Sequence, residues 1–301
     1  MPKGTVGQII DYKNGVRDGQ YILDDEYTEY PAQLTAIRIE KLLEEHESPY
    51  QHIAIYDTSY HGRMMVLDGF IQITTADYFC YHEMIVHVPM SVVPHEPKRV
   101  LVVGGGDGAA VNEFGKYKSL EKIVWIDIDA DVVRLCKKYM SELYTHHDER
   151  VEFIAMNGAD IEYEDEFDVV IVDGTDFIDA GSDLASNKFY QAITKALKPN
   201  GLVTTLGWWA WPDPDYHRLT KQMARTHFQH AHYYWFIDPS MKYGHMGVVL
   251  MTNSNLDPTM PTHLNRVPLE QLQYYNGPLH SAAFVLPTCF QKEGGFVVGK
   301  D

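Results

Sequence analysis

The chain has 301 residues, of which 45% are hydrophobic and 12% are aromatic. This composition is sufficient to bury a large core, in one domain or two, and excludes a disordered chain. The formal net charge of −17 argues against nucleic acid or an anionic membrane as the main partner, and it suits a cationic ligand if acidic side chains converge.

The three cysteines are far apart in the sequence and form no CxxC motif, which favours a reducing, cytoplasmic setting. No segment reaches the roughly 18 consecutive apolar residues of a membrane-spanning helix, so no membrane association is expected.

Residues 1–75 are rich in β-formers and turn residues, and we expect them to form a small antiparallel β domain. The dipeptides His-Gly at 61–62 and Asp-Gly at 68–69 are typical turns between strands. Strands are expected near 35–45 and at 50–59, 63–69 and 70–75.

Residues 76–301 alternate between strand and helix patterns, which predicts a doubly wound α/β domain of the Rossmann type with a parallel sheet. A strand, a glycine turn and a helix are expected in order within 98–117. Further strands are expected at 122–129, 150–157, 167–174, 202–209 and 244–253. Helices are expected at 76–93, 130–140, 187–201 and 215–228.

Ligands of such sheets bind at the carboxyl ends of the strands, so the residues that follow each strand are the candidates for a site. These residues are the glycine loop 104–108 with Asp107, and then Asp127, Asp129, Asn157, Asp173 and Asp176. Asp127 follows the glycines by about 20 residues, the spacing at which a carboxylate binds ribose hydroxyls. Asp129 is expected to start the next helix, and Asp173 taken alone also fits an ordinary turn.

The loop sequence GGGDGA fits both the dinucleotide pattern G-x-G-x-x-A and the G-x-G-x-G pattern of S-adenosylmethionine folds. A pyrophosphate bound at a helix N-terminus would be repelled by the carboxylate of Asp107. A sulfonium nucleoside that carries an ammonium group would be attracted. The loop therefore favours an adenosyl sulfonium ligand over NAD.

The chain resembles the polyamine aminopropyltransferases, the spermidine synthase family, over nearly its full length. The matching segments are YQHIAIYDT (50–58), LDGFIQIT (67–74), YHEM (81–84), VLVVGGGDG (100–108), IDID (126–129), VVIVDGTD (169–176) and YYNGPLHSAAFVLP (274–287). The resemblance implies a β domain before a methyltransferase-like α/β domain, in a homodimer or homotetramer. It also implies transfer of the aminopropyl group of decarboxylated S-adenosylmethionine to an amine, with release of methylthioadenosine and without a metal.

The resemblance assigns roles to residues at the matching positions. It implies that Asp173 is the base that accepts the amine proton and that Tyr81 lies beside the reacting amine. The donor would be bound by Gln51, Gln72, His82, Gly104, Gly106, Asp107, Asp127, Asn157 and Gly158. The acceptor would be bound by Asp77, Asp176, Trp208 and Met241.

The acceptor side departs from the family pattern. The family's DSSDP is DGTDF here, with Phe177 in place of proline, and a glutamine of the family appears as Leu206. The tyrosine of its TYPSG loop falls near Met241, and an acid next to Asp77 is replaced by Tyr78. These changes remove polar groups and add aromatic surface, so the sequence favours an acceptor that is larger or less charged than putrescine.

Two other functions remain open at the sequence level. One is a methyl or alkyl transferase that uses intact S-adenosylmethionine on a specialised acceptor, and the other is a non-catalytic nucleoside-binding scaffold. Retention of Asp107 and Asp173 favours aminopropyl transfer over the first, and the full set of donor residues speaks against the second. The histidines His227, His230 and His232 are interpreted as structural, because no acidic ligand follows at metal-binding spacing.

Overall fold

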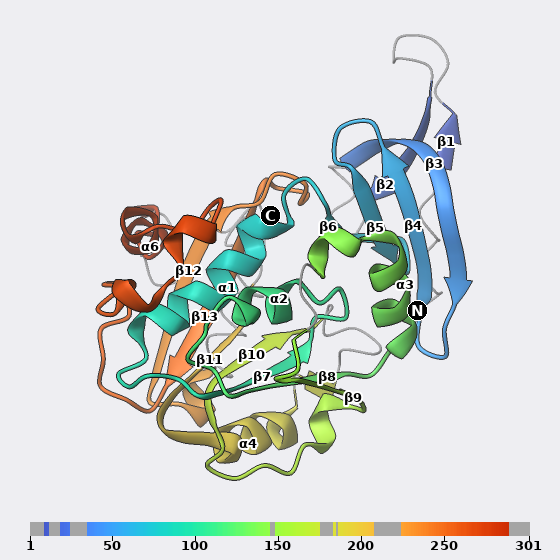
Figure 1. The fold of residues 1–301 in the computed structure, drawn as a ribbon. Helices are drawn as coiled ribbons and strands as arrows, with labels where there is room; N and C mark the ends of the chain where they lie inside the picture. Colours follow the sequence, from blue (N-terminus) through green and yellow to red (C-terminus); the bar gives the residue numbers. More distant parts are fainter. Residues whose placement is uncertain are drawn as a thin grey trace, which may run out of the picture.

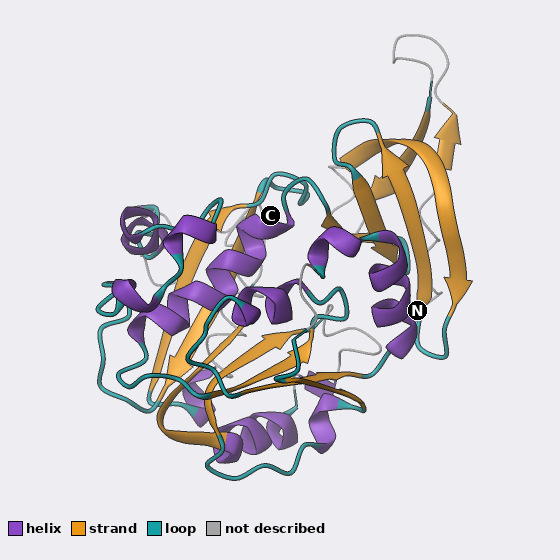
Figure 2. Ribbon diagram, in the orientation of Figure 1, coloured by secondary structure: helices purple, strands orange, loops and turns teal. Residues whose placement is uncertain are grey.

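The computed structural model describes residues 9–11, 19–24, 35–144, 148–174, 183–184, 186–207 and 224–288. Two β-sheets form the framework (Figure 1), and helices flank the second sheet (Figure 2). The architecture confirms the predicted antiparallel β unit followed by a Rossmann-like α/β unit.

The first sheet has six strands in chain order, and each pairs with its neighbour in antiparallel fashion. The strands are β1 (Ile9–Asp11), β2 (Gln20–Asp24), β3 (Thr35–Glu47), β4 (His52–Thr58), β5 (Arg63–Leu67) and β6 (Phe70–Thr74). Alternation along β4 sends Ile53 and Ile55 to one face of the sheet and Ala54 and Tyr56 to the other. The face that carries Ile53 packs on α3 (Ala130–Tyr139), and this contact joins the two sheets.

The second sheet has seven strands in the order β12-β13-β11-β10-β7-β8-β9. Its strands are β7 (Arg99–Gly104), β8 (Lys122–Asp127), β9 (Val151–Ala155), β10 (Phe167–Asp173), β11 (Leu197–Leu206), β12 (His230–Ile237) and β13 (His245–Thr252). The strands β7 to β11 run parallel, whereas β13 and β12 add an antiparallel hairpin at one edge. Apolar runs such as 100–103 and 169–172 are fully buried, because helices cover both faces of the sheet.

Helices α1 (Tyr78–Val92) and α2 (Ala109–Gly115) share one core with one face of this sheet, and α4 (Asn187–Ala196) packs on the other face. Helix α1 is apolar on nearly every side, as expected of a buried helix. Its Glu83 is fully buried and accepts backbone hydrogen bonds, each of 2.8 Å, from residues 273, 274 and 275. Short helices complete the chain: α6 (Gly277–Ala283) and the 3-10 helices η1 (Ser141–Leu143), η2 (Gly158–Asp160), η4 (Leu264–Arg266) and η5 (Leu269–Gln271). No helix of the described residues is long and apolar enough to cross a membrane.

One local prediction was wrong, and the strands β1, β2 and β12 were not predicted individually. The helix predicted for 187–201 ends at Ala196, and Leu197 already pairs with Phe167 of β10, so the Pro-Asn-Gly segment belongs to β11. Leu197 is buried in the core, and this burial stabilises a strand that begins directly after α4. Strand β12 was not predicted, because its histidines and aromatic residues carry no clear alternation. Of the helix predicted at 215–228, residues 224–227 are helical and 215–223 lie outside the described residues.

Candidate active site

A cavity of about 160 Å³ lies where the carboxyl ends of β7, β8 and β10 meet the first sheet. Every predicted site residue within the described ranges contributes to its wall. These residues are Gln51, Gln72, Asp77, Tyr81, His82, Gly104, Gly106, Asp107, Asp127, Asn157, Gly158, Asp173 and Met241. The predicted residues Asp176 and Trp208 lie outside the described residues.

The glycine loop after β7 brings two strand ends into close contact. Gly104 has φ +85°, and a Cβ atom there would lie 2.2 Å from the carbonyl oxygen of Asp173. The amide of Gly105 donates a 2.7 Å hydrogen bond to the same oxygen. A Cβ atom on Gly106 would lie 3.0 Å from a carboxylate oxygen of Asp127. The glycines therefore allow the carboxylates of Asp107, Asp127 and Asp173 to share one cavity.

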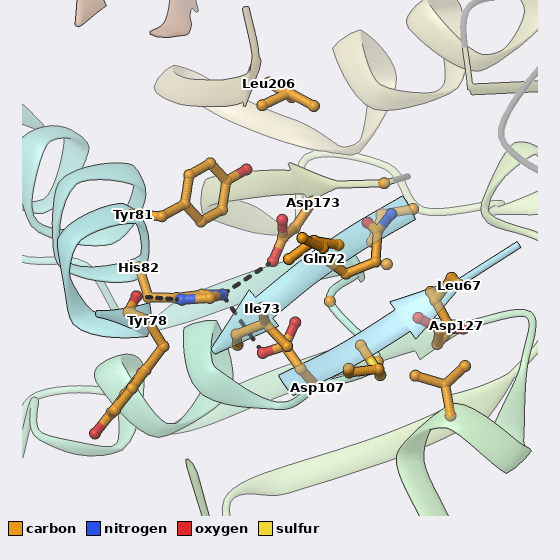
Figure 3. Close-up of a pocket in the computed structure, with 18 of the residues that line it drawn as sticks. Leu67, Gln72, Ile73, Tyr78, Tyr81, His82, Asp107, Asp127, Asp173 and Leu206 are labelled. Carbon is orange, nitrogen blue, oxygen red and sulfur yellow. Dashed lines mark hydrogen bonds and ion pairs between the residues drawn. The ribbon is translucent and has the colours of Figure 1, made fainter. Parts of the chain in front are cut away.

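His82 lies between two of these carboxylates (Figure 3). Its Nδ1 atom is 2.7 Å from the carbonyl oxygen of Tyr78, which can only accept, so Nδ1 carries a proton. Its Nε2 atom is 3.4 Å from Asp107 and 3.7 Å from Asp173. Burial lowers the pKa of His82, but the two carboxylates outweigh it and raise the pKa above its ordinary value.

Asp173 lies at the centre of the cavity, with Tyr81 and Leu206 on one side and Asp107 and Asp127 on the other (Figure 3). Burial and the charge of Asp107 raise the pKa of Asp173 to about 6, although His82 opposes this shift. Its Oδ2 atom is buried and has no hydrogen-bond partner among the described residues. Such an oxygen is available to a group that enters the cavity.

Tyr81 stands on α1 and is partly buried beside Asp173. Burial and the charge of Asp173 raise the pKa of its hydroxyl well above the ordinary value. The hydroxyl is therefore neutral at physiological pH and acts as a hydrogen-bond donor or acceptor without adding charge.

Asp127 ends β8, and burial raises the pKa of its carboxyl to about 7. Its neighbour Asp129 has a role that the sequence did not predict. Asp129 caps α3, as expected, but its Oδ2 atom also accepts hydrogen bonds from the Ser48 hydroxyl at 2.6 Å and from Gln51 Nε2 at 2.9 Å. Asp129 thus holds Gln51, a residue of the first sheet unit, against the wall of the cavity.

Asn157 and Gly158 shape the cavity after β9. The side-chain oxygen of Asn157 caps η2 by accepting from the amide of Ala159 at 2.9 Å, and its Nδ2 atom donates to Asp183 at 2.8 Å. A Cβ atom on Gly158 would lie 2.3 Å from Val103. These contacts fix the backbone of this turn at the cavity wall.

Asp77, immediately before α1, links the two sheet units on the Tyr81 side of the cavity. Its Oδ1 atom accepts from the Thr74 hydroxyl at 2.5 Å, and its Oδ2 atom accepts from the amide of Ser240 at 2.6 Å. Ser240 and Asp238, in the loop after β12, also line the cavity. Sequence reasoning placed Met241 there but missed these two; the polar run Asp-Pro-Ser directly after an aromatic segment was the available signal.

His82, Asp107 and Asp173 form a cluster among the described residues in which potential ligand atoms all lie within 4.8 Å of one another. The spacing could accommodate a cation. An ammonium or sulfonium group meets the same requirement as a metal ion, because each carries a positive charge toward the carboxylates. The sequence-based expectation of a metal-free site remains an expectation.

Comparison with known proteins identifies two family models. The Spermine/spermidine synthase domain matches residues 78–260, and the Spermidine synthase tetramerisation domain matches residues 24–75.

Among similar proteins, a polyamine aminopropyltransferase of Caldicellulosiruptor saccharolyticus is 36% identical over 258 residues, which cover 85% of this chain and 92% of the relative. The spermine synthase of Arabidopsis thaliana is 30% identical over 278 residues, which cover 88% of this chain and 77% of that protein.

Solved structures of spermidine synthases have the same fold. One, in complex with the transition-state analogue AdoDATO, superposes with a TM-score of 0.85 at 28% identity, over 93% of this chain and 95% of the other. The enzyme of Thermotoga maritima superposes with a TM-score of 0.81 at 28% identity, over 91% and 94% of the two chains.

Proposed function

This chain belongs to the spermidine synthase family, and on that premise we propose that it transfers an aminopropyl group from decarboxylated S-adenosylmethionine to an amine and releases methylthioadenosine. The observation that carries the proposal is the convergence of Asp107, Asp127 and Asp173 on one cavity. Such a site attracts a cationic donor and a cationic acceptor, and it repels a pyrophosphate.

In this mechanism, the amine nitrogen attacks the aminopropyl carbon that is bonded to sulfur. A C–N bond forms, the C–S bond breaks, and its electron pair neutralises the sulfonium to give a thioether. The attacking amine must first lose a proton, since a free amine of this kind has a pKa of roughly 10. The protein therefore has to supply a base and an aligned approach rather than a strong activating group.

Asp173 is suited to the role of that base. With a pKa of about 6 it is ionised at neutral pH, yet it is more basic than an ordinary aspartate. Its buried Oδ2 atom accepts no hydrogen bond among the described residues and can take the proton of the amine. The neutral hydroxyl of Tyr81 beside it can orient the nitrogen without competing for the proton.

Asp107 favours the decarboxylated donor. Intact S-adenosylmethionine has a carboxylate next to its ammonium group, and this carboxylate would face Asp107 and Asp173 together. Like charges at such short range disfavour binding. The alternative, a methyl or alkyl transferase that uses the intact donor, therefore has the weaker support.

We further propose that the domain boundary lies between residues 75 and 76, and that the enzyme works in the cytoplasm. The match of residues 24–75 to a tetramerisation domain supports assembly of several copies. A homodimer or homotetramer is our proposal for its size, which sedimentation velocity would measure.

The test is direct incubation of the protein with either donor and a panel of amines, followed by mass spectrometry of the nucleoside products. The proposal expects methylthioadenosine that depends on both the decarboxylated donor and an amine. Formation of S-adenosylhomocysteine from the intact donor would support the methyl transferase instead. The absence of both products would leave a nucleoside-binding scaffold.

A further inference from the structure

The loop after β12 contributes a polar group of atoms to the cavity wall. Asp238 is 4% exposed and Ser240 is 3% exposed, and both line the cavity. Three backbone hydrogen bonds fix the loop. The Asp238 amide donates to the Gly244 carbonyl at 3.1 Å, the Met241 amide to the Asp238 carbonyl at 3.2 Å, and the Gly244 amide to the Met241 carbonyl at 2.8 Å. The amide of Ser240 is bound to Asp77, so this loop is anchored to the start of α1.

This loop lies on the Tyr81 side of the cavity. Asp77 and Tyr81 are four residues apart at the start of α1, and they therefore lie on the same side of the helix. The rings of Tyr81 and Phe236 are 6.1 Å apart. Asp238 follows Phe236 by two residues, directly after β12 ends at Ile237.

The fold does little to stabilise the charged form of Asp238. Within the described ranges its side chain takes part in no ion pair and accepts no hydrogen bond. Its pKa is raised to about 8 by burial and then by Asp77, and His82 lowers it. Cys80 and Tyr274 also face it, and its charge raises the pKa of each. With a pKa of about 8 the carboxyl group is mostly neutral at pH 7, and a cation that binds beside it favours the ionised form. A buried carboxyl group that lines a cavity is therefore suited to bind an ammonium group.

A second observation concerns Ser240, on the same part of the cavity wall. The Oγ atom of Ser240 is buried and has no hydrogen-bond partner among the described residues. A primary ammonium group has three N–H donors and no acceptor. Two carboxylates and one hydroxyl are the complement of such a group.

We propose that Asp238 is an acceptor-specificity residue, whose carboxylate acts with Ser240 Oγ and Asp77 to hold a second ammonium group of the amine acceptor. The inference rests on the proposed aminopropyl transfer. It assigns the acceptor to the amines that keep a protonated nitrogen at the end remote from Asp173, and it revises the sequence-based expectation of a less charged acceptor.

The test compares Asp238→Asn with the native protein on two acceptors, butane-1,4-diamine and butylamine, which differ by the remote ammonium group alone. For the diamine, kcat/KM should fall roughly ten- to hundred-fold, mainly through KM, because hydrogen bonds to a charged group are lost. For butylamine, kcat/KM should change by less than about two-fold, since its apolar end makes no such bond.

The matched control is Glu270→Gln, which removes one carboxylate from an exposed position and should leave both acceptors unaffected. Asp238→Glu keeps the charge and should restore part of the preference for the diamine. Thermal melting and calorimetric donor affinity verify the fold of each variant. If Asp238→Asn does not fold, Ser240→Ala serves in its place. This variant should raise KM for the diamine about three-fold or more, because it loses one hydrogen bond to the acceptor.

The outcomes separate the two proposals. A native protein that makes no methylthioadenosine from either amine overturns the proposed function. A native protein that is active, with the same diamine-to-butylamine ratio in a folded Asp238→Asn or Ser240→Ala variant, overturns the specificity role and leaves the function standing. If butylamine reacts too slowly, calorimetric binding of both amines in the presence of methylthioadenosine gives the same ratio.

Discussion

Replacing Asp173 with asparagine should lower the activity of the enzyme and raise its free energy of unfolding. Asparagine has nearly the same shape as aspartate, but it cannot accept the proton of the amine. Turnover should therefore fall about 10²- to 10⁴-fold, the usual contribution of a positioned general base. Donor affinity should fall far less than turnover, because most of the proposed donor contacts lie on other residues.

The same substitution should stabilise the protein. The pKa of Asp173 rises from an ordinary value of 3.8 to about 6 on folding, so the ionised carboxylate opposes folding. The penalty is absent at a pH below the unfolded-state value, grows as the pH rises, and is complete above the folded-state value. It amounts to about 3 kcal/mol at pH 7.5 and to roughly half of that at pH 5, since one pKa unit is worth about 1.4 kcal/mol. Asp173→Asn removes the penalty.

Urea unfolding measures the free energy of unfolding of the native protein and of the variant at pH 7.5 and at pH 5. A product assay measures turnover. Asp57→Asn is the control, because this side chain is 45% exposed and its removal should change the free energy of unfolding by less than about 0.5 kcal/mol. Two results would refute the reasoning: retained turnover, or a stability gain at pH 7.5 no larger than at pH 5.

Three further substitutions test other parts of the site. Gly104→Ala places a Cβ atom 2.2 Å from a carbonyl oxygen at the end of β10 and imposes strain at φ +85°. The free energy of unfolding, measured with denaturant, should therefore fall by about 2 kcal/mol or more. An unchanged midpoint of the unfolding transition would contradict the close approach. Asp129→Ala removes the hydrogen bond that holds Gln51 against the cavity wall. In steady-state kinetics, KM for the donor should rise about ten-fold while kcat stays within about two-fold of the native value. A merely structural role of Asp129 would not change KM alone. Glu83→Gln replaces an oxygen by an NH₂ group that faces backbone amides, and urea titration should show a loss of about 2–4 kcal/mol; near-native stability would mean that these three hydrogen bonds contribute little.

The positions of the strand-end residues could be predicted from the sequence because they depend on local patterns. Apolar runs that end in glycine or aspartate define β7, β8 and β10, and parallel pairing then brings their ends together without further information. Thirteen of the fifteen predicted residues line one cavity for this reason, and the other two lie outside the described residues. Their assigned roles remain predictions until the variants are measured.

The missed features depend on long-range contacts. Strand β12 has no clear period of its own and becomes a strand by pairing with β13. Asp238 and Ser240 enter the cavity only because that hairpin brings their loop to the start of α1. The second role of Asp129 requires Ser48 and Gln51, about 80 residues away along the chain. Local sequence patterns carry no information about such pairs.

The hydrogen bonds from Ser48 and Gln51 to Asp129 have a consequence for dynamics. They couple the first sheet to the part of the cavity wall that is proposed to bind the donor, so a bound donor and the docking of the two sheets stabilise each other. Backbone amides near the β3–β4 turn should therefore exchange more slowly with solvent deuterium when the donor is bound. The small sheet would then report on the occupancy of a site that lies mainly in its neighbour.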